Sequence, residues 1–149
     1  MVRIALVAVF AASLASAADE PKLSKDEQEV VDLTNAERKV ANLPPLKVND
    51  TLMAAARAHA ANMAKQGKLD HVLDGKKHSD RTKAAGYASG FVGENISWNS
   101  KDPKETVAGW MNSQGHKDNI LNKDYADIGV AMTKSEKGEP YWVQVFGKP

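Results

Sequence analysis

The 149-residue sequence contains no cysteine. Disulfide bonds, thiol nucleophiles and thiolate metal sites are therefore excluded, and the folded state must be stabilised by its core alone. The sequence also lacks an excess of charge of either sign, because 20 basic residues stand against 19 acidic ones for a net charge of +1. This balance argues against a nucleic acid or a charged membrane surface as the partner.

Several familiar motifs are missing as well. The sequence contains no His-Glu-x-x-His helix, no Gly-x-Ser-x-Gly turn, no glycine-rich phosphate loop and no EF-hand loop. The usual sequence signatures of zinc peptidases, α/β-hydrolases, nucleotide-binding proteins and calcium sensors are thus absent. Any site must be assembled from residues that are far apart in the chain.

The one continuous apolar run lies near the N terminus, at residues 4–14, and is too short to span a bilayer. Arg3 precedes it and small residues up to Ala17 follow it, which is the pattern of a signal peptide cleaved after Ala17. An uncleaved anchor is the alternative. We expect a secreted or periplasmic protein without a membrane span. The predicted parts are a signal peptide at 1–17, a linker at 18–24 and a single domain at 25–149.

Helices are predicted from apolar spacing and from capping residues. Ser24 and Glu27 form a capping box, and Gly67 suits the left-handed position that ends a helix. Asp102 can cap a later helix, in which Pro103 takes the first position. The predicted helices span residues 24–41, 50–66, 81–85 and 102–112.

Strands are predicted mainly near the C terminus. Residues 128–132 and 141–146 alternate in hydropathy on either side of a turn at 136–139, and residues 93–98 form a shorter extended segment. Helices that precede a hairpin favour an α+β fold, with the helices stacked on an antiparallel sheet.

Without cysteine, histidines and carboxylates are the remaining candidates for chemistry. His71, Glu94 and His116 each fall on a predicted loop or element end, and Gly115 is predicted to adopt a left-handed conformation that places His116 at a chain reversal. If the three meet, two imidazoles and one carboxylate could bind a divalent ion such as zinc, or serve in general acid–base chemistry without a metal. His59, in the middle of a helix, is predicted to be a hydrogen-bonded core or boundary residue.

A series of short motifs runs in order through nearly all of the chain after about residue 25. They are Asn35-Ala36-Glu37-Arg38, Leu69-Asp70-His71, Asp80-Arg81, Ala85-Gly86-Tyr87, Gly93-Glu94-Asn95-Ile96, Gly109-Trp110-Met111-Asn112-Ser113, Gly115-His116, Asn119-Ile120-Leu121, Ile128-Gly129-Val130 and Tyr141-Trp142-Val143-Gln144. Together they resemble a bacterial-type member of the CAP superfamily, or SCP domain, which includes cysteine-rich secretory proteins, antigen 5 and pathogenesis-related proteins.

The resemblance implies a three-layer α-β-α sandwich with a central antiparallel sheet. It also implies a cleft that gathers His71, Glu94 and His116 and that can bind a divalent metal ion such as zinc. Ser113 holds the position where many animal members have a second glutamate, so the usual set of four is incomplete. Asn95, Ser113 and His78 are further candidate binding residues, although His78 lies outside the family's site and either lines the cleft or is a solvated loop residue.

Function varies within this superfamily, so the resemblance does not decide the activity. We expect a non-catalytic, monomeric binding module that contacts a lipid, cell-wall or protein ligand. The alternative is a metal-dependent, peptidase-like hydrolase in which Glu94 is the general base. A third reading assigns the polar cluster a purely structural role.

Overall fold

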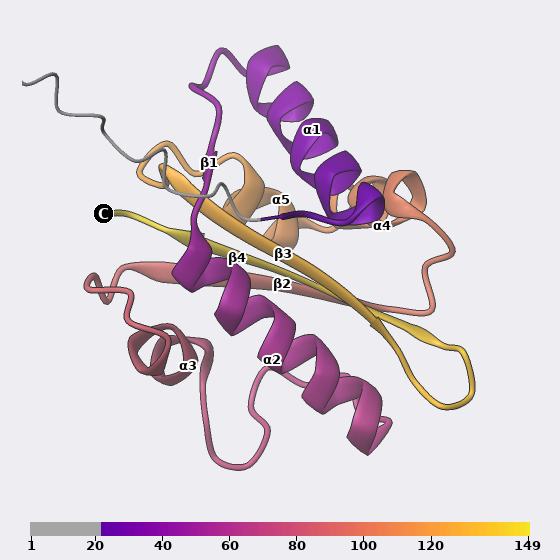
Figure 1. Ribbon diagram of the computed structural model, residues 1–149. Helices are drawn as coiled ribbons and strands as arrows, with labels where there is room; N and C mark the ends of the chain where they lie inside the picture. The colour runs from indigo at the N-terminus through magenta and orange to yellow at the C-terminus, as the bar shows by residue number, and fades with distance from the viewer. Residues whose placement is uncertain (1–21) are drawn as a thin grey trace, which may run out of the picture.

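The computed structural model describes residues 22–149, so the predicted signal peptide and most of the predicted linker lie outside the described residues. Within this range no helix is both long and apolar enough to cross a membrane. The helices and strands follow one another along the chain as shown in Figure 1. They are α1 (Lys25–Val40), β1 (Lys47–Val48), α2 (Asp50–Gln66), α3 (His78–Ala84), β2 (Val92–Trp98), α4 (Pro103–Met111), α5 (Gln114–Ile120), β3 (Asp127–Lys134) and β4 (Pro140–Gly147).

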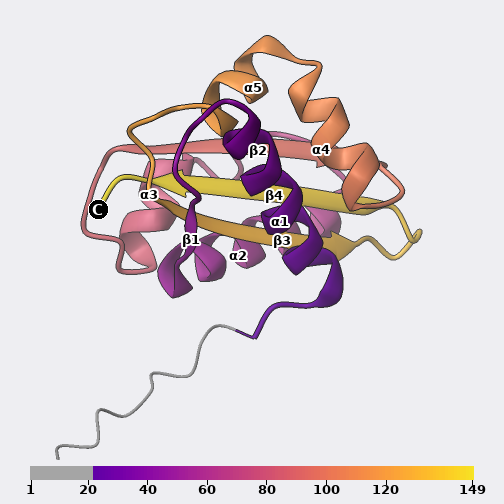
Figure 2. The same cartoon turned by 90° about the horizontal axis from the view of Figure 1, so that it is seen from above.

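The strands described form one sheet in the order β1-β3-β4-β2. Strand β4 is antiparallel to both β2 and β3, while the two-residue β1 joins β3 in parallel and makes the sheet mixed. Helices α2 and α3 cover one face, and α1, α4 and α5 cover the other (Figure 2). The predicted α+β class and the three-layer α-β-α sandwich are confirmed, and the sheet is antiparallel as predicted except for the short strand β1.

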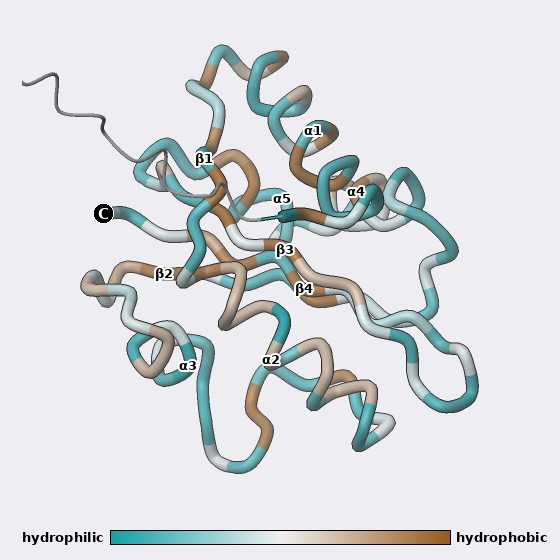
Figure 3. The backbone as a smooth tube through the Cα atoms, in the orientation of Figure 1, coloured by the Kyte–Doolittle hydropathy of each residue, from teal (hydrophilic) through white to brown (hydrophobic). Residues whose placement is uncertain are grey.

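Each face of the sheet has its own hydrophobic core, because successive side chains of a strand point to opposite faces. In β4, Tyr141, Val143 and Val145 pack on the side of α2, while Trp142 and Phe146 pack on the side of α1, α4 and α5. Figure 3 shows apolar residues along the strands and a hydrophilic turn between β3 and β4. Burial on both faces fits a central strand that is covered by two helical layers.

The predicted helix ends are largely confirmed. Helix ends are set by residues close in sequence, so they can be predicted from the sequence. The backbone N–H of Ser24 donates to Glu27 Oε2 at 2.8 Å, and Ser24 Oγ accepts from the N–H of Glu27, which completes the capping box. Asn49 caps α2, and Gly67 ends it in a left-handed conformation with φ of 62°. Helix α3 starts three residues earlier than predicted.

The prediction for Gly115 and His116 was wrong. Helix α4 ends at Met111, the chain turns at Asn112 and Ser113, and α5 begins at once at Gln114. Gly115 is therefore helical, and His116 lies in the first turn of α5 and not at a chain reversal. Ser113 sits in an extended conformation, so it, and not the glycine, makes the break between the two helices.

Helix α2 lies directly on β3, and a glycine makes this approach possible. A Cβ atom on Gly129 would lie 2.2 Å from the backbone carbon of Leu52, closer than side-chain atoms come. The adjacent N–H of Val130 donates to Met53 Sδ at 3.1 Å. This close contact fixes α2 against the sheet and brings His59 beneath β2.

Candidate functional site

The site is centred on Glu94, in the middle of strand β2. Glu94 pairs with Val145 of β4 and shares a face with Ile96, which packs in the core on the α2 side. Its side chain is only 1% exposed. A carboxylate at this position would be costly to bury unless charged or hydrogen-bonding groups compensate it.

Two side chains engage the Glu94 carboxylate. Oε1 accepts from His71 Nδ1 at 2.9 Å, and Oε2 accepts from Arg81 Nη2 at 2.5 Å. Because an ionised carboxylate only accepts hydrogen bonds, Nδ1 of His71 carries the proton that is donated to Glu94. The His71 ring is about half exposed.

Arg81 also connects the loop before α3 to the sheet. Its Nη1 donates to the backbone carbonyls of His71, at 3.0 Å, and Lys76, at 2.8 Å, while Nη2 holds Glu94. The guanidinium thus positions the loop that carries His71. Sequence analysis assigned no role to Arg81, because its partner Glu94 lies on a different element.

These contacts determine the ionisation of Glu94. Burial raises the pKa of Glu94, but the hydrogen bond with His71 and the charge of Arg81 lower it more, so the pKa lies below its ordinary value of 4.5. Glu94 is therefore ionised at neutral pH and is a weak base.

His59 lies beneath the pair, with Nε2 3.8 Å from Glu94 Oε1. The ring is fully buried, as predicted, but within residues 22–149 neither of its nitrogens has a hydrogen-bond partner, contrary to the prediction. Burial lowers the pKa of His59 despite the nearby carboxylate of Glu94. The imidazole is therefore neutral at pH 7.

A cavity of about 420 Å³ opens beside Glu94. His78, at the start of α3, lines it together with His71, and burial lowers the pKa of His78. From the opposite face, Asn119 of α5 reaches the edge of β2 and donates to the Glu94 carbonyl at 3.2 Å. The lining residues are His71, Val72, Lys77, His78, Val92, Gly93, Glu94, Asn119 and Tyr125. His78 therefore lines this cavity, and its role as a binding residue stays a prediction.

The remaining predicted site residues lie outside this lining. Asn95 is completely buried; its amide donates to the His116 carbonyl and to Gln144 Oε1, which joins α5 to the sheet. Ser113 precedes α5 and is partly buried. The pKa of the partly buried His116 is lowered mainly by burial and to a smaller extent by the charge of His71.

The described side chains do not fit a metal ion as they stand. No three His, Asp or Glu residues among residues 22–149 lie close enough together to hold one. Both oxygens of Glu94 are already engaged, one of them by the positive charge of Arg81. Zinc binding by His71, Glu94 and His116 stays a prediction, and it requires Arg81 to release the carboxylate.

Comparison with known proteins identifies the family. The sequence profile of the CAP family, described as the cysteine-rich secretory protein family, matches residues 31–146. The chain belongs to the CAP family. The family description refers to cysteine-rich proteins, but this CAP domain has no cysteine, so its fold is maintained without disulfides.

Its relatives include bacterial CAP proteins. The uncharacterized Bacillus subtilis protein YkwD is 39% identical over 125 residues, which are 83% of this chain and 48% of YkwD. An outer surface protein from Borrelia burgdorferi has a TM-score of 0.79 at 25% identity, with 84% of this chain and 93% of that one covered. An extracellular SCP-domain protein from Bacillus anthracis has a TM-score of 0.75 at 27% identity, and the match covers 83% of this chain and 40% of that one. The chain thus spans about half of YkwD.

Proposed function

We propose that this CAP domain is an extracellular, non-catalytic binding module whose cavity beside Glu94 binds a small polar ligand. The location is supported by the predicted signal peptide and by the names of two relatives, one an outer surface protein and the other an extracellular protein. The absence of catalysis is supported chiefly by the contacts of Glu94.

The observation that carries the proposal is the engagement of both Glu94 oxygens by His71 and Arg81. An effective general base needs a pKa near the working pH and an oxygen within reach of the proton that it removes. Glu94 has a lowered pKa, and its side chain is almost completely buried. Glu94 therefore lacks the properties of the general base that the hydrolase alternative requires.

The lining of the cavity favours a ligand with a negatively charged group, such as a carboxylate or a phosphate. Arg81 neutralises Glu94, whereas Lys77 is exposed and lines the same cavity. His71, His78 and the Asn119 amide add hydrogen-bond donors and acceptors. A lipid headgroup, an acidic cell-wall component and a peptide C terminus all supply this chemistry.

The test is a titration followed by NMR of the histidine rings. Inorganic phosphate, acetate and a dipeptide with a free C terminus are added to the domain, and at least one should shift the His71 and His78 signals saturably. Lys77→Gln should weaken this binding, whereas Lys123→Gln, a matched change of an exposed lysine outside the lining, should not. No saturable shift with any of the three probes would contradict the proposal.

Catalysis is tested separately with a screen of peptide and ester substrates. The proposal predicts no turnover above that of a Glu94→Gln variant. Hydrolysis by the wild type that disappears in Glu94→Gln, with the fold unchanged by NMR, would establish the hydrolase instead.

A further inference from the structure

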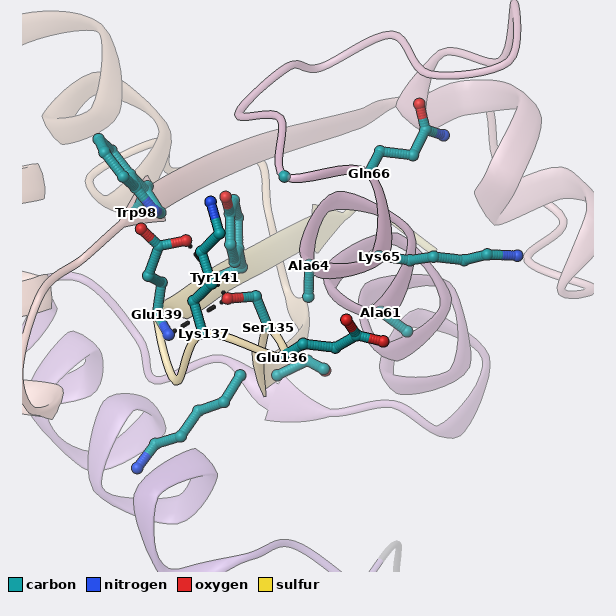
Figure 4. A pocket seen from close by; sticks show the side chains of 13 residues that line it. Ala61, Ala64, Lys65, Gln66, Trp98, Ser135, Glu136, Lys137, Glu139 and Tyr141 are labelled. Atoms are coloured by element: carbon teal, nitrogen blue, oxygen red, sulfur yellow. Dashed lines mark hydrogen bonds between the residues drawn. The ribbon is translucent and has the colours of Figure 1, made fainter.

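A second, larger groove of about 700 Å³ lies between the end of α2 and the β3–β4 hairpin. It shares no lining residue with the cavity beside Glu94. Ala61 and Ala64 line it on the side of the helix, and Ser135, Lys137 and Glu139 line the opposite side (Figure 4). Gly67, which ends α2, also belongs to the lining. Small residues on the helix leave room for an occupant.

Trp98, at the end of β2, lines this groove and is 47% exposed. The other two tryptophans, Trp110 and Trp142, are buried, and their indole N–H groups donate to backbone carbonyls. An indole has a large apolar face and a polar edge, and such side chains are enriched where a partner covers the face. The exposure of Trp98 therefore marks one side of the groove as a contact surface.

Tyr141 of β4 supplies a second, independent feature. It lines the groove, and no residue of the described range forms a hydrogen bond with its hydroxyl, which is not among the buried unpartnered atoms of that range and is therefore accessible to solvent. A phenol hydroxyl that faces solvent can donate a hydrogen bond to a ligand and accept one from it. Trp98 of β2 and Tyr141 of β4 are paired across the two strands, and Figure 4 shows both in the groove.

We propose that this groove binds a sugar ring of a saccharide. The C–H face of a pyranose stacks on Trp98, while the Tyr141 hydroxyl and the Lys137 amine bond to its hydroxyl groups. Sugar hydroxyls both donate and accept, so they match this mixture of donors and acceptors.

Other classes of ligand fit the groove less well. Trp98 is its one large exposed apolar side chain among the described lining residues, which is too little for an acyl chain. A peptide cannot add to β4 as a strand, because β2 and β3 already pair with both of its edges. Lysines and glutamates alternate along the hairpin, so the groove has no strong preference for a charged ligand.

The test is an NMR titration of the isotope-labelled domain with chitotriose, cellotriose and maltotriose at millimolar concentrations. At least one trisaccharide should shift the amide signals of Gly67, Trp98 and Gly138 saturably. Trp98→Ala should weaken this binding about tenfold or more, the scale of one lost stacking contact. Tyr141→Phe should weaken it without changing Tm.

Phe91→Ala is the matched control, because Phe91 is 48% exposed and lies outside the groove lining. It should bind like the wild type. The proposal is overturned if no trisaccharide shifts the groove signals, if Trp98→Ala binds as tightly as the wild type, or if the shifts map to the cavity beside Glu94. Because the two sites share no lining residue, failure here leaves the proposed function of that cavity untouched, and the reverse also holds.

Discussion

Replacing Arg81 with methionine removes the cation that neutralises Glu94 while keeping most of the side-chain volume. The guanidinium is 11% exposed and the carboxylate 1%, so the pair is buried. Removing one partner of a buried ion pair costs about 3–5 kcal/mol, because the remaining charge is left uncompensated.

The structure places the expected cost at the lower end of this range, about 3 kcal/mol. His71 continues to donate to Glu94 Oε1 in the variant. The two other bonds of Arg81 go to carbonyls of His71 and Lys76 in exposed surroundings, where water can replace the guanidinium. A loss of this size is a large part of the roughly 5–15 kcal/mol that stabilises a typical domain.

The assay is urea unfolding of the wild type, Arg81→Met, Glu94→Gln and the double variant. The double variant should be more stable than Arg81→Met alone, because it no longer buries an unpaired charge. The cost of Arg81→Met should also shrink on acidification, since burial then raises the pKa of Glu94 and lets the carboxyl take up a proton. A cost below about 1 kcal/mol, the scale of an exposed pair, would refute the reasoning.

Three further predictions concern packing, pH and metal. Gly129→Ala should destabilise the fold by about 1–3 kcal/mol, because a Cβ atom there meets the backbone of α2. Gly109→Ala, where a Cβ atom has no neighbour within 4 Å, should instead stabilise α4 by up to about 1 kcal/mol through helix propensity. Urea unfolding measures both changes, and equal effects would contradict the packing account. Burial lowers the pKa of His59 from 6.5, so the unfolded chain binds the proton more readily than the folded chain, and the free energy of unfolding should fall as pH drops below 6.5. His59→Leu should make the free energy of unfolding depend less on pH, which urea unfolding on both sides of pH 6.5 measures. An unchanged pH dependence in the variant would contradict this role of His59. Zinc should leave the Tm of the wild type unchanged, because Arg81 holds Glu94. It should raise the Tm of Arg81→Met, in which Glu94 no longer pairs with Arg81 and can bind zinc together with His71. A rise in the Tm of the wild type that is lost in His71→Ala would contradict this expectation and show that the metal displaces Arg81.

Features that depend on neighbouring residues were predictable from the sequence. Helix α1 begins at the Ser24–Glu27 capping box, α2 ends at Gly67, and the two strands of the C-terminal hairpin alternate as expected. Such features follow from backbone geometry and hydropathy within a few residues. The motifs that resemble the CAP superfamily then predicted the arrangement of the layers.

Features that depend on distant partners were not predictable in this way. Strand β1 has only two residues, and its pairing with β3 exists because the fold brings Lys47 beside Asp127. Gly115 is helical because Ser113 already breaks the chain, so the usual meaning of a glycine after a helix did not apply. A local pattern cannot show which of two adjacent residues makes the break.

The candidate site was predicted in part. The structure brings His71 into contact with Glu94 and places His78 in the same cavity, but Asn95 is used to join α5 to the sheet. Arg81 was missed because an arginine in a short helix is most often a solvated residue. Its importance arises only from the buried carboxylate that the fold places beside it.

The ionisation of Glu94 can be measured directly by carbon-13 NMR of its side-chain carboxyl, with Glu94→Gln used to assign the signal. If His71 and Arg81 hold the carboxylate as described, its titration midpoint lies below 4.5. A midpoint near neutrality, at about 6–7 where general bases work, would contradict the locked carboxylate and the non-catalytic function proposed from it.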